Sequence, residues 1–424
     1  MVNIRSYPFK TREPFMKNYG TKAQNWLTQL AKYSETQEGV TRRPFTSEHQ
    51  QAIDQLTLWM EQAGLEVTLD NAGTLIGRYN SPVSSNTLLF GSHQDSIRKG
   101  GRYDGIMGVV LPIIAMEEIL SQKVELPFSV EIMAFADEEG VRFPTALIGP
   151  RALAGTLDTS VLDLKDAQGI SIREAMIQFG LSGKDFDLLT RDPQNLLGYL
   201  EVHIEQGPVL ESNNLALGVV TAICGIERHE IQFVGESAHA GTCPMELRKD
   251  ALSAAAHVIA EAESYARQTA DLKATVGRLH VEPNVVNAVP SHAAFSVEIR
   301  SPDDATRTEA GEHIHRYAAQ LAKERSLQVT TEKTYQQVAQ PCSDELQSRL
   351  QTAIKNIGQP SFTLPSGATH DASAMADLVP MGMLFVRSEN GLSHNPAEFT
   401  SDEDMGLAVE ALIELLTMSS EQED

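Results

Sequence analysis

The sequence contains few cysteines and no long apolar segment. Its three cysteines, Cys224, Cys243 and Cys342, are widely spaced and odd in number, so they indicate neither a disulfide framework nor a CxxC metal knuckle. No uncharged apolar stretch reaches the length of about 18 residues that a membrane-spanning helix requires, so no membrane partner is expected. The first ten residues also lack the apolar core of a secretory signal. We therefore expect a cytoplasmic protein.

Basic residues are scarce compared with acidic ones. The chain has 34 lysines and arginines against 57 aspartates and glutamates, which gives a formal net charge of -23. Such a surface repels phosphate backbones, and no basic cluster stands out, so nucleic acid is not expected as a partner. The remaining composition, with 42% apolar and 21% charged residues over 424 positions, is typical of a globular protein with two domains.

Alternating strands and helices are predicted for most of the chain. Hydrophobic periodicity predicts two N-terminal helices, at 22–33 and 47–63. Further strands are expected at 87–90, 128–135, 198–203 and 381–386, and further helices at 109–120, 345–357 and 402–418. Pro112 is compatible with a helix only in its first turn. This order predicts an α/β sheet covered by helices on both faces.

The segment 219–331 has a different pattern. Strands are expected at 230–235, 274–281, 293–299 and 327–331, with helices at 250–267 and 306–324. The resulting order, βαββαβ, matches the ferredoxin-like split motif, which forms a unit of its own. We therefore predict an α/β domain formed by residues 1–218 and 332–424, with a smaller α+β domain, 219–331, inserted into it.

Side chains that can bind metal follow four of the predicted strands. They are His93 and Asp104 after the strand at 87–90, Glu138 and Glu139 after 128–135, His203 at the end of 198–203, and His394 after 381–386. Ligand sites of open α/β sheets lie beyond the carboxyl ends of the strands. We therefore expect these side chains to meet at one edge of the sheet.

This set of side chains predicts a site for two metal ions. Any one of them alone is more often structural or solvated, but imidazoles and carboxylates together are what zinc, manganese, cobalt and nickel sites use. Five ligands serve two ions with open positions only if one carboxylate is shared, and Asp104, which lies between glycines, is the expected bridge. Of the adjacent Glu138 and Glu139, one would bind metal and the other would transfer the proton of the attacking water.

The motifs around these residues resemble a known family. They are GSHQDS at 91–96, GGRYDG at 100–105, DEEGVRF at 137–143, HIEQGPVL at 203–210, HAGTCPM at 239–245, PNVVN at 283–287, PSGATHDA at 365–372 and SHNPAE at 393–398. The family comprises N-carbamoyl-L-amino acid hydrolases, allantoate amidohydrolases and β-ureidopropionases, which belong with aminoacylase- and carboxypeptidase-like metallopeptidases. The resemblance implies a zinc-peptidase-like α/β catalytic domain with an inserted ferredoxin-like α+β domain that serves as dimerisation domain and lid.

The resemblance also implies how the metal site is divided. It makes His93, Asp104, Glu139, His203 and His394 the ligands of two divalent ions, zinc or manganese, with cobalt or nickel as alternatives. Asp104 would bridge the ions, and Glu138 would be the catalytic acid/base. It further implies a homodimer formed through the inserted domain.

Further residues match family positions for substrate. His239 matches the histidine that a neighbouring subunit offers to the developing oxyanion, and from sequence alone an ordinary surface histidine is equally expected. Asn287 and Arg300 match residues that hold the substrate carboxylate, although the sequence alone favours an internal ion pair of Arg300 with Asp303 or Asp304. The other matched positions in the substrate pocket are Gln206, Ser366 and Gly367. His370 and Asp371 are expected to support the pocket.

Three positions depart from the family pattern. Cys243 stands where the family has threonine, and Ser291 and Thr369 each replace a glycine. If the position of Thr369 needs a positive φ or a close backbone approach to substrate, threonine is unfavourable there. None of these positions is a predicted metal ligand.

The reaction implied is hydrolysis of the carbamoyl (ureido) C–N bond of a small substrate that carries a carboxylate. N-carbamoyl-L-amino acids, N-carbamoyl-β-alanine and allantoate all qualify, and each would release ammonia and carbon dioxide. A hydrolase of N-acyl amino acids or dipeptides is the alternative within the enzymes. A non-catalytic metal- or ligand-binding protein is the alternative of another class, and the presence of Glu138 beside all five ligands argues against it.

Overall fold

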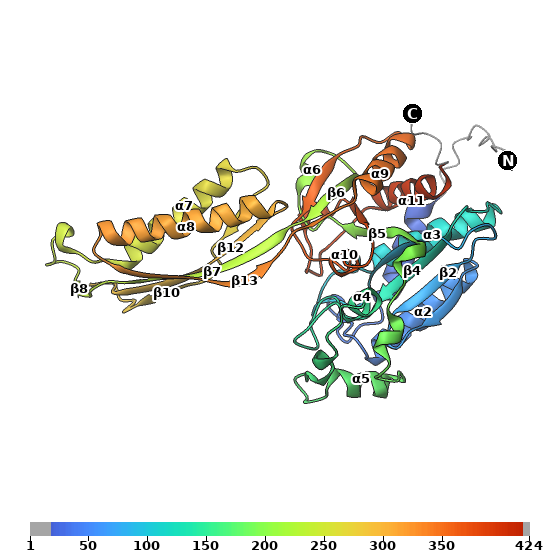
Figure 1. The fold of residues 1–424 in the computed structure, drawn as a ribbon, viewed down its shortest axis with the longest axis horizontal. Coiled ribbons are helices and arrows are strands. Elements are labelled where there is room, and N and C mark those ends of the chain that lie inside the picture. The colour runs from blue at the N-terminus through green and yellow to red at the C-terminus, as the bar shows by residue number, and fades with distance from the viewer. Residues whose placement is uncertain (1–17, 419–424) are drawn as a thin grey trace.

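The computed structural model describes residues 18–418, which form two lobes of unequal size (Figure 1). The larger lobe contains the N-terminal and C-terminal parts of the described chain, and the smaller lobe is formed by a segment between them. The first ten residues, considered above for a secretory signal, lie outside the described residues. Within the described part, no helix is both long enough and apolar enough to cross a bilayer.

Nine strands form the sheet of the larger lobe. In spatial order they are β1 (Glu66–Leu69), β2 (Leu75–Tyr79), β4 (Ser129–Phe135), β3 (Thr87–His93), β5 (Leu196–Ile204), β16 (Met381–Val386), β6 (Leu217–Ile223) and β14 (Gln340–Pro341), with β15 (Thr363–Ser366) paired with β6. The four central strands β4, β3, β5 and β16 run parallel, whereas the pairings β1–β2, β2–β4, β16–β6 and β6–β14 are antiparallel. The carboxyl ends of the central strands therefore lie at the same edge.

Helices cover both faces of this sheet, as predicted. One core includes residues of α1 (Tyr19–Leu30), α2 (Ser47–Gln62), α3 (Met107–Ser121), α9 (Asp344–Asn356) and α11 (Asp402–Thr417), and the other includes residues of α4 (Ile148–Ala154) and α10 (Ala372–Met375). Leu88 and Phe90 of β3 belong to the first core and Leu89 to the second, because successive side chains of a strand point to opposite faces. The central strands are thus buried on both sides.

Helix α3 begins earlier than the sequence indicated. It starts at Met107, so Pro112 is its sixth residue and lies beyond the first turn to which the prediction confined it. Proline supplies no N–H, so the helix forgoes the hydrogen bond that this position would otherwise make. The helix is apolar on all sides, with eleven buried residues. Its packing between the sheet and α11 stabilises it despite the missing bond.

The smaller lobe has the predicted βαββαβ order. Its elements are β7 (Gly225–Val234), α7 (Ala251–Gln268), β9 (Lys273–Thr275) with β10 (Leu279–Glu282), β12 (His292–Ser301), α8 (Asp304–Glu324) and β13 (Gln328–Gln337). The antiparallel sheet runs β10-β12-β7-β13, which is the order of the ferredoxin-like split motif. Its strands extend from residue 225 to residue 337, whereas the inserted domain was predicted at 219–331. The smaller lobe begins later than predicted because β6 (Leu217–Ile223) pairs with β16 and so belongs to the large sheet.

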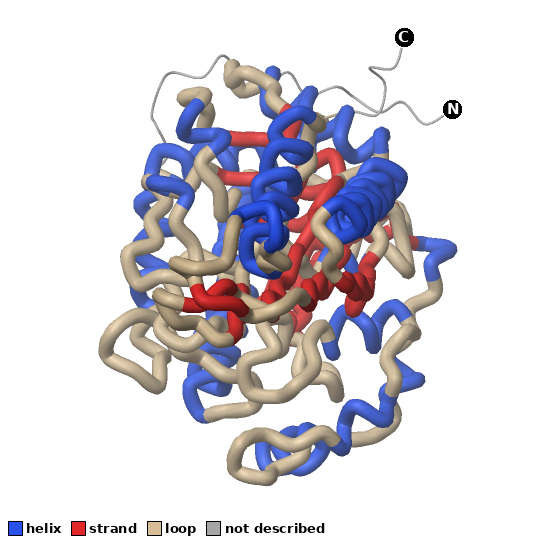
Figure 2. The backbone as a smooth tube through the Cα atoms, turned by 90° about the vertical axis from the view of Figure 1, so that its left-hand side faces the viewer, coloured by secondary structure: helices blue, strands red, loops and turns tan. Residues whose placement is uncertain are grey.

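The two helices of the smaller lobe cover only one face of its sheet (Figure 2). Every second residue of β12 is buried against them, including Phe295 and Ile299, while the residues between are only partly covered. Among the described residues, no helix of the smaller lobe covers the opposite face. A short two-stranded pairing of β8 (Ala238–His239) with β11 (Ala288–Val289) lies at the end of the lobe that is distant from the large sheet (Figure 1).

Candidate metal centre and substrate cavity

The four central strands deliver the predicted metal ligands to one edge of the large sheet. His93 is the last residue of β3, His203 is near the end of β5, Glu138 and Glu139 follow β4, and His394 follows β16. Asp104 comes from the loop between β3 and α3. Because β4, β3, β5 and β16 are neighbours and parallel, these side chains meet. The structure therefore brings all five predicted ligands and Glu138 together.

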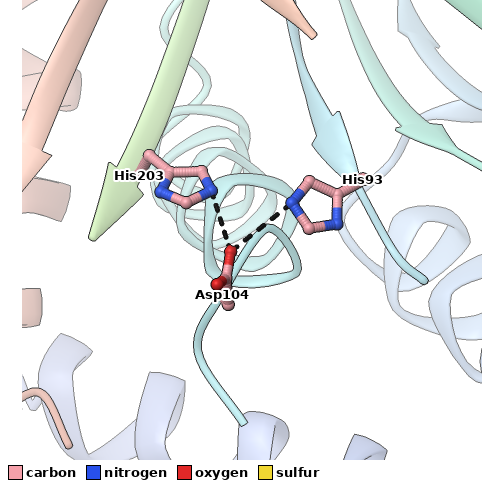
Figure 3. Close-up of side chains that lie close together, drawn as sticks. All are labelled: His93, Asp104 and His203. Carbon is pink, nitrogen blue, oxygen red and sulfur yellow. Dashed lines mark ion pairs between the residues drawn. The ribbon is translucent and has the colours of Figure 1, made fainter. Parts of the chain in front are cut away.

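Asp104 lies at the centre of this group. Its Oδ1 is 3.1 Å from His203 Nε2 and 3.5 Å from His93 Nε2, as the dashed lines of Figure 3 show. Its other oxygen, Oδ2, is 3.4 Å from His394 Nε2. His394 Nε2 is also 3.6 Å from Glu139 Oε2. One carboxylate thus contacts three imidazoles, two through one oxygen and one through the other.

The ligand atoms divide into two sets that share Asp104. One set is His93, Asp104 and His203, the other is Asp104, Glu139 and His394, and within each set the donor atoms lie within 4.8 Å of one another. Each set offers nitrogen and carboxylate oxygen donors, which zinc and manganese accept. Glu139 Oε1 is buried and has no hydrogen-bond partner among the described residues. The donor set therefore fits two ions that share Asp104.

The backbone around Asp104 is shaped to bring it against the histidines. Gly105 has a φ of +67°, and a Cβ atom there would lie 2.3 Å from the His93 ring. Glu398 Oε1 accepts the backbone N–H groups of Tyr103 and Asp104, each at 3.0 Å. Only glycine permits both the conformation and the close approach at 105. Glu398 therefore holds the loop through its backbone, and Gly105 lets the loop approach the His93 ring closely.

Two further side chains hold the Asp104 carboxylate itself. Ser393 Oγ donates to Asp104 Oδ2 at 2.7 Å, and Gln206 Nε2 donates to the same oxygen at 2.9 Å. Ser393 also contacts Glu398 Oε2 at 3.1 Å. The roles of Ser393 and Glu398 were not predicted. The motif SHNPAE at 393–398 was the signal that could have indicated them.

Asp95 orients residues on both sides of the site. It is buried, and its two carboxylate oxygens accept the backbone N–H groups of Glu138 at 3.1 Å and Glu139 at 3.2 Å. The backbone carbonyl of Asp95 lies 3.0 Å from His93 Nδ1, which leaves Nε2 of that ring facing Asp104. Such outer hydrogen bonds fix the tautomer and direction of a metal-binding imidazole. Asp95 therefore links the two glutamates to His93.

The carboxylates at this edge are crowded, as the run at 137–139 predicted. Burial, reinforced by the charges of Glu139 and Asp371, raises the pKa of Glu138 well above its usual value. Burial and the nearby Asp104 and Asp95 raise the pKa of Glu139 to about 8. Burial opposes ionisation of Asp104, but its hydrogen bonds with His203 and His93 outweigh this and lower its pKa well below the usual value. Cations at this place would relieve the repulsion.

His370 and Asp371 lie beneath the centre, where they were expected to support it. Both are buried, and the His370 ring lies 4.5 Å from the ring of His203, centroid to centroid. Ser366 Oγ and His370 Nε2 are hydrogen-bonded at 2.7 Å. Burial, together with the nearby His203, lowers the pKa of His370 well below its usual value. His370 therefore packs against His203 and is held by Ser366.

The metal centre opens into a cavity of about 770 Å³ between the lobes. From the larger lobe its walls include His93, Asp104, Glu138, Glu139, Arg151, Gln206, Gln340, Thr369, Asp377 and His394, and from the smaller lobe Arg228, Arg300, Tyr335, Gln336 and Gln337. Polar side chains thus dominate the lining. The contributions of Arg151, Arg228 and the glutamines of 336–340 were not predicted, because nothing in their sequence context marks them.

The sequence and the fold are similar to those of known proteins. Residues 87–418 match the family model described as "Peptidase family M20/M25/M40". The chain is 40% identical over 375 residues to an N-carbamoyl-L-amino acid amidohydrolase of Geobacillus stearothermophilus, covering 88% of this chain and 92% of that protein. The chain belongs to peptidase family M20/M25/M40. The family resemblance inferred from the motifs is thereby confirmed.

Two further comparisons agree with this membership of the M20 family. An allantoate deiminase of Arabidopsis thaliana is 36% identical over 422 residues, covering 92% of this chain and 80% of that protein. The crystal structure of an amidase of the hydantoinase/carbamoylase family from Burkholderia multivorans has a TM-score of 0.87 at 31% identity, covering 94% of this chain and 97% of that one. M20 enzymes are metal-dependent hydrolases, and the chain shares their mixed α/β fold.

Arg300 is the predicted substrate residue that the M20 fold brings to the cavity wall from the smaller lobe. Its guanidinium pairs with Glu298, at 2.7 Å from Nη2 and 2.8 Å from Nε, and donates to the backbone carbonyl of Gly367 across the lobes. The alternative partners considered from sequence are occupied elsewhere, because Asp303 caps α8 and Asp304 pairs with Arg307. Arg300 thus faces the metal centre from the opposite lobe.

The segment 366–369 meets the cavity through its later residues. Ser366 is buried and its hydroxyl bonds to His370, so Ala368 and Thr369 line the cavity in its place. Gly367 contributes its carbonyl to Arg300. Thr369 and Ser291 are not among the residues with positive φ, so the conformational cost considered for Thr369 does not arise.

His239 and Asn287 lie away from the cavity of their own chain. They sit side by side at the β8–β11 pairing, where Ala240 N donates to the Asn287 carbonyl at 2.9 Å, at the far end of the smaller lobe (Figure 1). Both side chains are exposed. The structure therefore brings neither residue to the metal centre within one chain.

Proposed function

We propose that the protein is a binuclear-metal amidohydrolase that cleaves the ureido C–N bond of an N-carbamoyl-L-amino acid or allantoate, releasing ammonia and carbon dioxide. One observation carries the proposal: two ligand sets share the Asp104 carboxylate, in a cavity that Glu138 and Arg300 also line. The relatives named above, an N-carbamoyl-L-amino acid amidohydrolase and an allantoate deiminase, support this substrate class. A carboxylate is common to these substrates.

The ligand assignment follows the two sets. His93 and His203 would hold one divalent ion and Glu139 and His394 the other, with Asp104 between them; zinc or manganese fits these donors, as do cobalt and nickel. When bound, the ions would supply Lewis acidity, which lowers the pKa of water and polarises the ureido carbonyl. Ser393 and Gln206 hold the Asp104 carboxylate and Glu398 holds its backbone, so that Asp104 would be in place to serve both ions.

Glu138 would move the proton. It lines the cavity beside His93 and Glu139, its side chain is partly buried, and Asp95 fixes its backbone. In the reaction the water oxygen bonds to the ureido carbon, Glu138 takes the proton released, and it returns that proton to the leaving nitrogen as the C–N bond breaks. Burial raises the pKa of Glu138 above its usual value, which makes its carboxylate a stronger base than an ordinary glutamate.

Arg300 would bind the substrate carboxylate. Its planar guanidinium can donate two parallel hydrogen bonds to a carboxylate. Contacts with Glu298 and Gly367 hold this guanidinium toward the cavity. Gln206 would contact substrate from the opposite lobe, beside Asp104. Because Arg300 belongs to the smaller lobe, a substrate that contacts both groups would draw the lobes together, which is the proposed role of that lobe as a lid.

The site would be completed by a second copy of the chain, bound through the smaller lobe. His239 would polarise the ureido oxygen and Asn287 would hold the carboxylate in the partner's cavity. Their segment carries unusually exposed apolar side chains, with Val286 103% and Met245 74% exposed, and Leu247 and Val285 are exposed nearby. Exposed apolar residues gathered in one region indicate a contact surface.

The proposed function is tested by ammonia release from the purified protein loaded with manganese or zinc. The substrates are allantoate, several N-carbamoyl-L-amino acids and N-carbamoyl-β-alanine, with an N-acetyl amino acid and a dipeptide assayed for amide hydrolysis. We expect turnover of at least one ureido compound. Turnover of the acyl or peptide compounds alone would favour the peptidase-like alternative, and metal binding without any turnover would favour a non-catalytic protein.

A further inference from the structure

A second cluster of metal-binding side chains lies on the open face of the smaller lobe. His280 and Glu282 are two residues apart on β10, so both point to the same face, and His292 of β12 stands directly opposite Glu282 in the strand register. The buried residues of β12, such as Ala293 and Phe295, point to the helices instead. The three side chains thus project together from the uncovered side of the sheet.

The distances within this cluster suit coordination of one ion. Donor atoms of His280, Glu282 and His292 all lie within 4.8 Å of one another. His280 Nε2 is 3.0 Å from Glu282 Oε1, and the two imidazole rings have centroids 6.1 Å apart. Register across a β-ladder, rather than a flexible loop, sets these positions. No ordering of a loop is needed to assemble the group.

His292 and Glu282 have few other partners among the described residues. His292 Nε2 accepts from the Gln232 side-chain amide at 2.7 Å, while its Nδ1 has no hydrogen-bond partner there. Within residues 18–418, Glu282 pairs only with His280 and has no lysine or arginine partner.

We infer that His280, Glu282 and His292 form a further site for a transition-metal ion, of which Zn²⁺ is the simplest probe. Two imidazoles and one carboxylate are a recurring set of three protein ligands for zinc, and water completes the coordination. The site is separate from the Asp104 centre, and the inference does not depend on the proposed reaction.

An ion bound at this site would also affect the neighbouring segment 283–291. It lies at the base of the segment 283–291, which leaves β10 after Glu282 and returns to β12 at His292. That base is closed by two hydrogen bonds, from Ser291 N to the Glu282 carbonyl at 3.0 Å and from Gly235 N to the Ser291 carbonyl at 2.7 Å. An ion bound across β10 and β12 joins both ends of the segment that carries Asn287, and so restricts its motion.

The test is to count zinc ions bound by the full chain after removal of metal with a chelator. Equilibrium dialysis followed by elemental analysis is expected to show one ion fewer per chain in His280→Ala/His292→Ala than in the unaltered protein. His257→Ala/His313→Ala, which removes two imidazoles from the helical side of the same lobe, is the matched control and is expected to bind as much zinc as the unaltered protein. Equal zinc content in all three proteins would overturn the inference.

A second measurement does not depend on counting. Hydrogen exchange of the segment 283–291 is expected to slow when zinc is added to the unaltered protein and to stay unchanged in His280→Ala/His292→Ala. An Asp104→Ala protein, in which the catalytic ligand sets lose their shared member, is expected to keep the zinc-dependent slowing. If the slowing disappears with Asp104→Ala and persists in the double-histidine variant, the effect comes from the catalytic centre and the inference is wrong.

Discussion

At the scale of single residues, the properties of the metal centre depend on one carboxylate. Asp104 contacts His93, His203 and His394, and its own position is set by Gly105 and Glu398. The ligand types could be predicted from sequence, because His and Asp/Glu after successive strands have few structural explanations together. The role of Glu398 was not predicted, although it lies in the motif SHNPAE, because the sequence does not show that its carboxylate accepts two backbone N–H groups.

Glu138 and Glu139 are adjacent but are expected to respond differently to the same substitution. Glu138→Gln is expected to lower kcat by about 10²- to 10⁴-fold, the usual contribution of general acid–base catalysis, while metal content stays unchanged. Glu139→Gln is expected to lower metal content as well, because Glu139 shares a ligand set with Asp104 and His394, whereas Glu138 is grouped only with His93 and Glu139. Elemental analysis beside steady-state kinetics measures both. Loss of metal in both variants to the same extent would mean that the roles of the two glutamates are misassigned.

Arg300 is expected to act on substrate capture rather than on the chemical step. Hydrogen bonds to charged groups contribute about 1.5–3 kcal/mol, so Arg300→Lys, which removes the bidentate geometry, is expected to raise KM by about tenfold or more. Arg278→Lys is the matched control, since Arg278 lies on the same lobe and pairs with Glu230 outside the cavity. An unchanged KM in Arg300→Lys would remove Arg300 from the substrate site.

At the scale of elements, parallel strands explain why the site could be located from sequence. The predicted strands 87–90, 128–135, 198–203 and 381–386 correspond to β3, β4, β5 and β16, which are mostly apolar and are buried along their length except at the first two residues of β5. The edge strand β1 was missed because its residues are mostly exposed and carry no apolar run. The later residues of the apolar strand β6 were predicted to belong to the inserted domain. The prediction was wrong because periodicity does not reveal which sheet a buried strand joins.

The turn before α3 provides a test of how the backbone positions the ligands. Gly105→Ala would place a Cβ against the His93 ring and force a positive φ on alanine, a strain of about 1–3 kcal/mol. Zinc affinity is therefore expected to fall by about tenfold. Gly169→Ala is the control, because Gly169 has a φ of +81° but a Cβ there meets nothing within 4 Å. Zinc titration of both proteins separates displacement of His93 from backbone strain alone, and equal affinity would contradict this account of the turn.

At the scale of the whole molecule, the arrangement of the lobes was beyond the sequence. The βαββαβ order of the smaller lobe was predictable from periodicity, but its position opposite the metal centre depends on how β6 and β14 join the large sheet at its edge. The location of His239 and Asn287 at the distant end of that lobe follows from the same geometry (Figure 1). These two residues can reach a metal centre only in another copy of the chain, if they act as proposed.

Mixed dimers test this use of two chains. Glu138→Gln and His239→Ala are each expected to impair turnover strongly when present in both copies. When the two variants are co-expressed with different affinity tags and the mixed dimers isolated, one cavity combines an intact Glu138 with an intact His239 of the partner subunit, and activity is expected to return to about half of the unaltered value. Mixed dimers as inactive as the parents would show that His239 acts within its own chain or not at all.

The most direct test of the central claim is the anomalous scattering of crystals grown with zinc. The account predicts two strong peaks on either side of the Asp104 carboxylate, one beside His93 and His203 and the other beside Glu139 and His394. A single peak, or a pair of peaks that do not share Asp104, would contradict the proposed binuclear centre and the mechanism built on it.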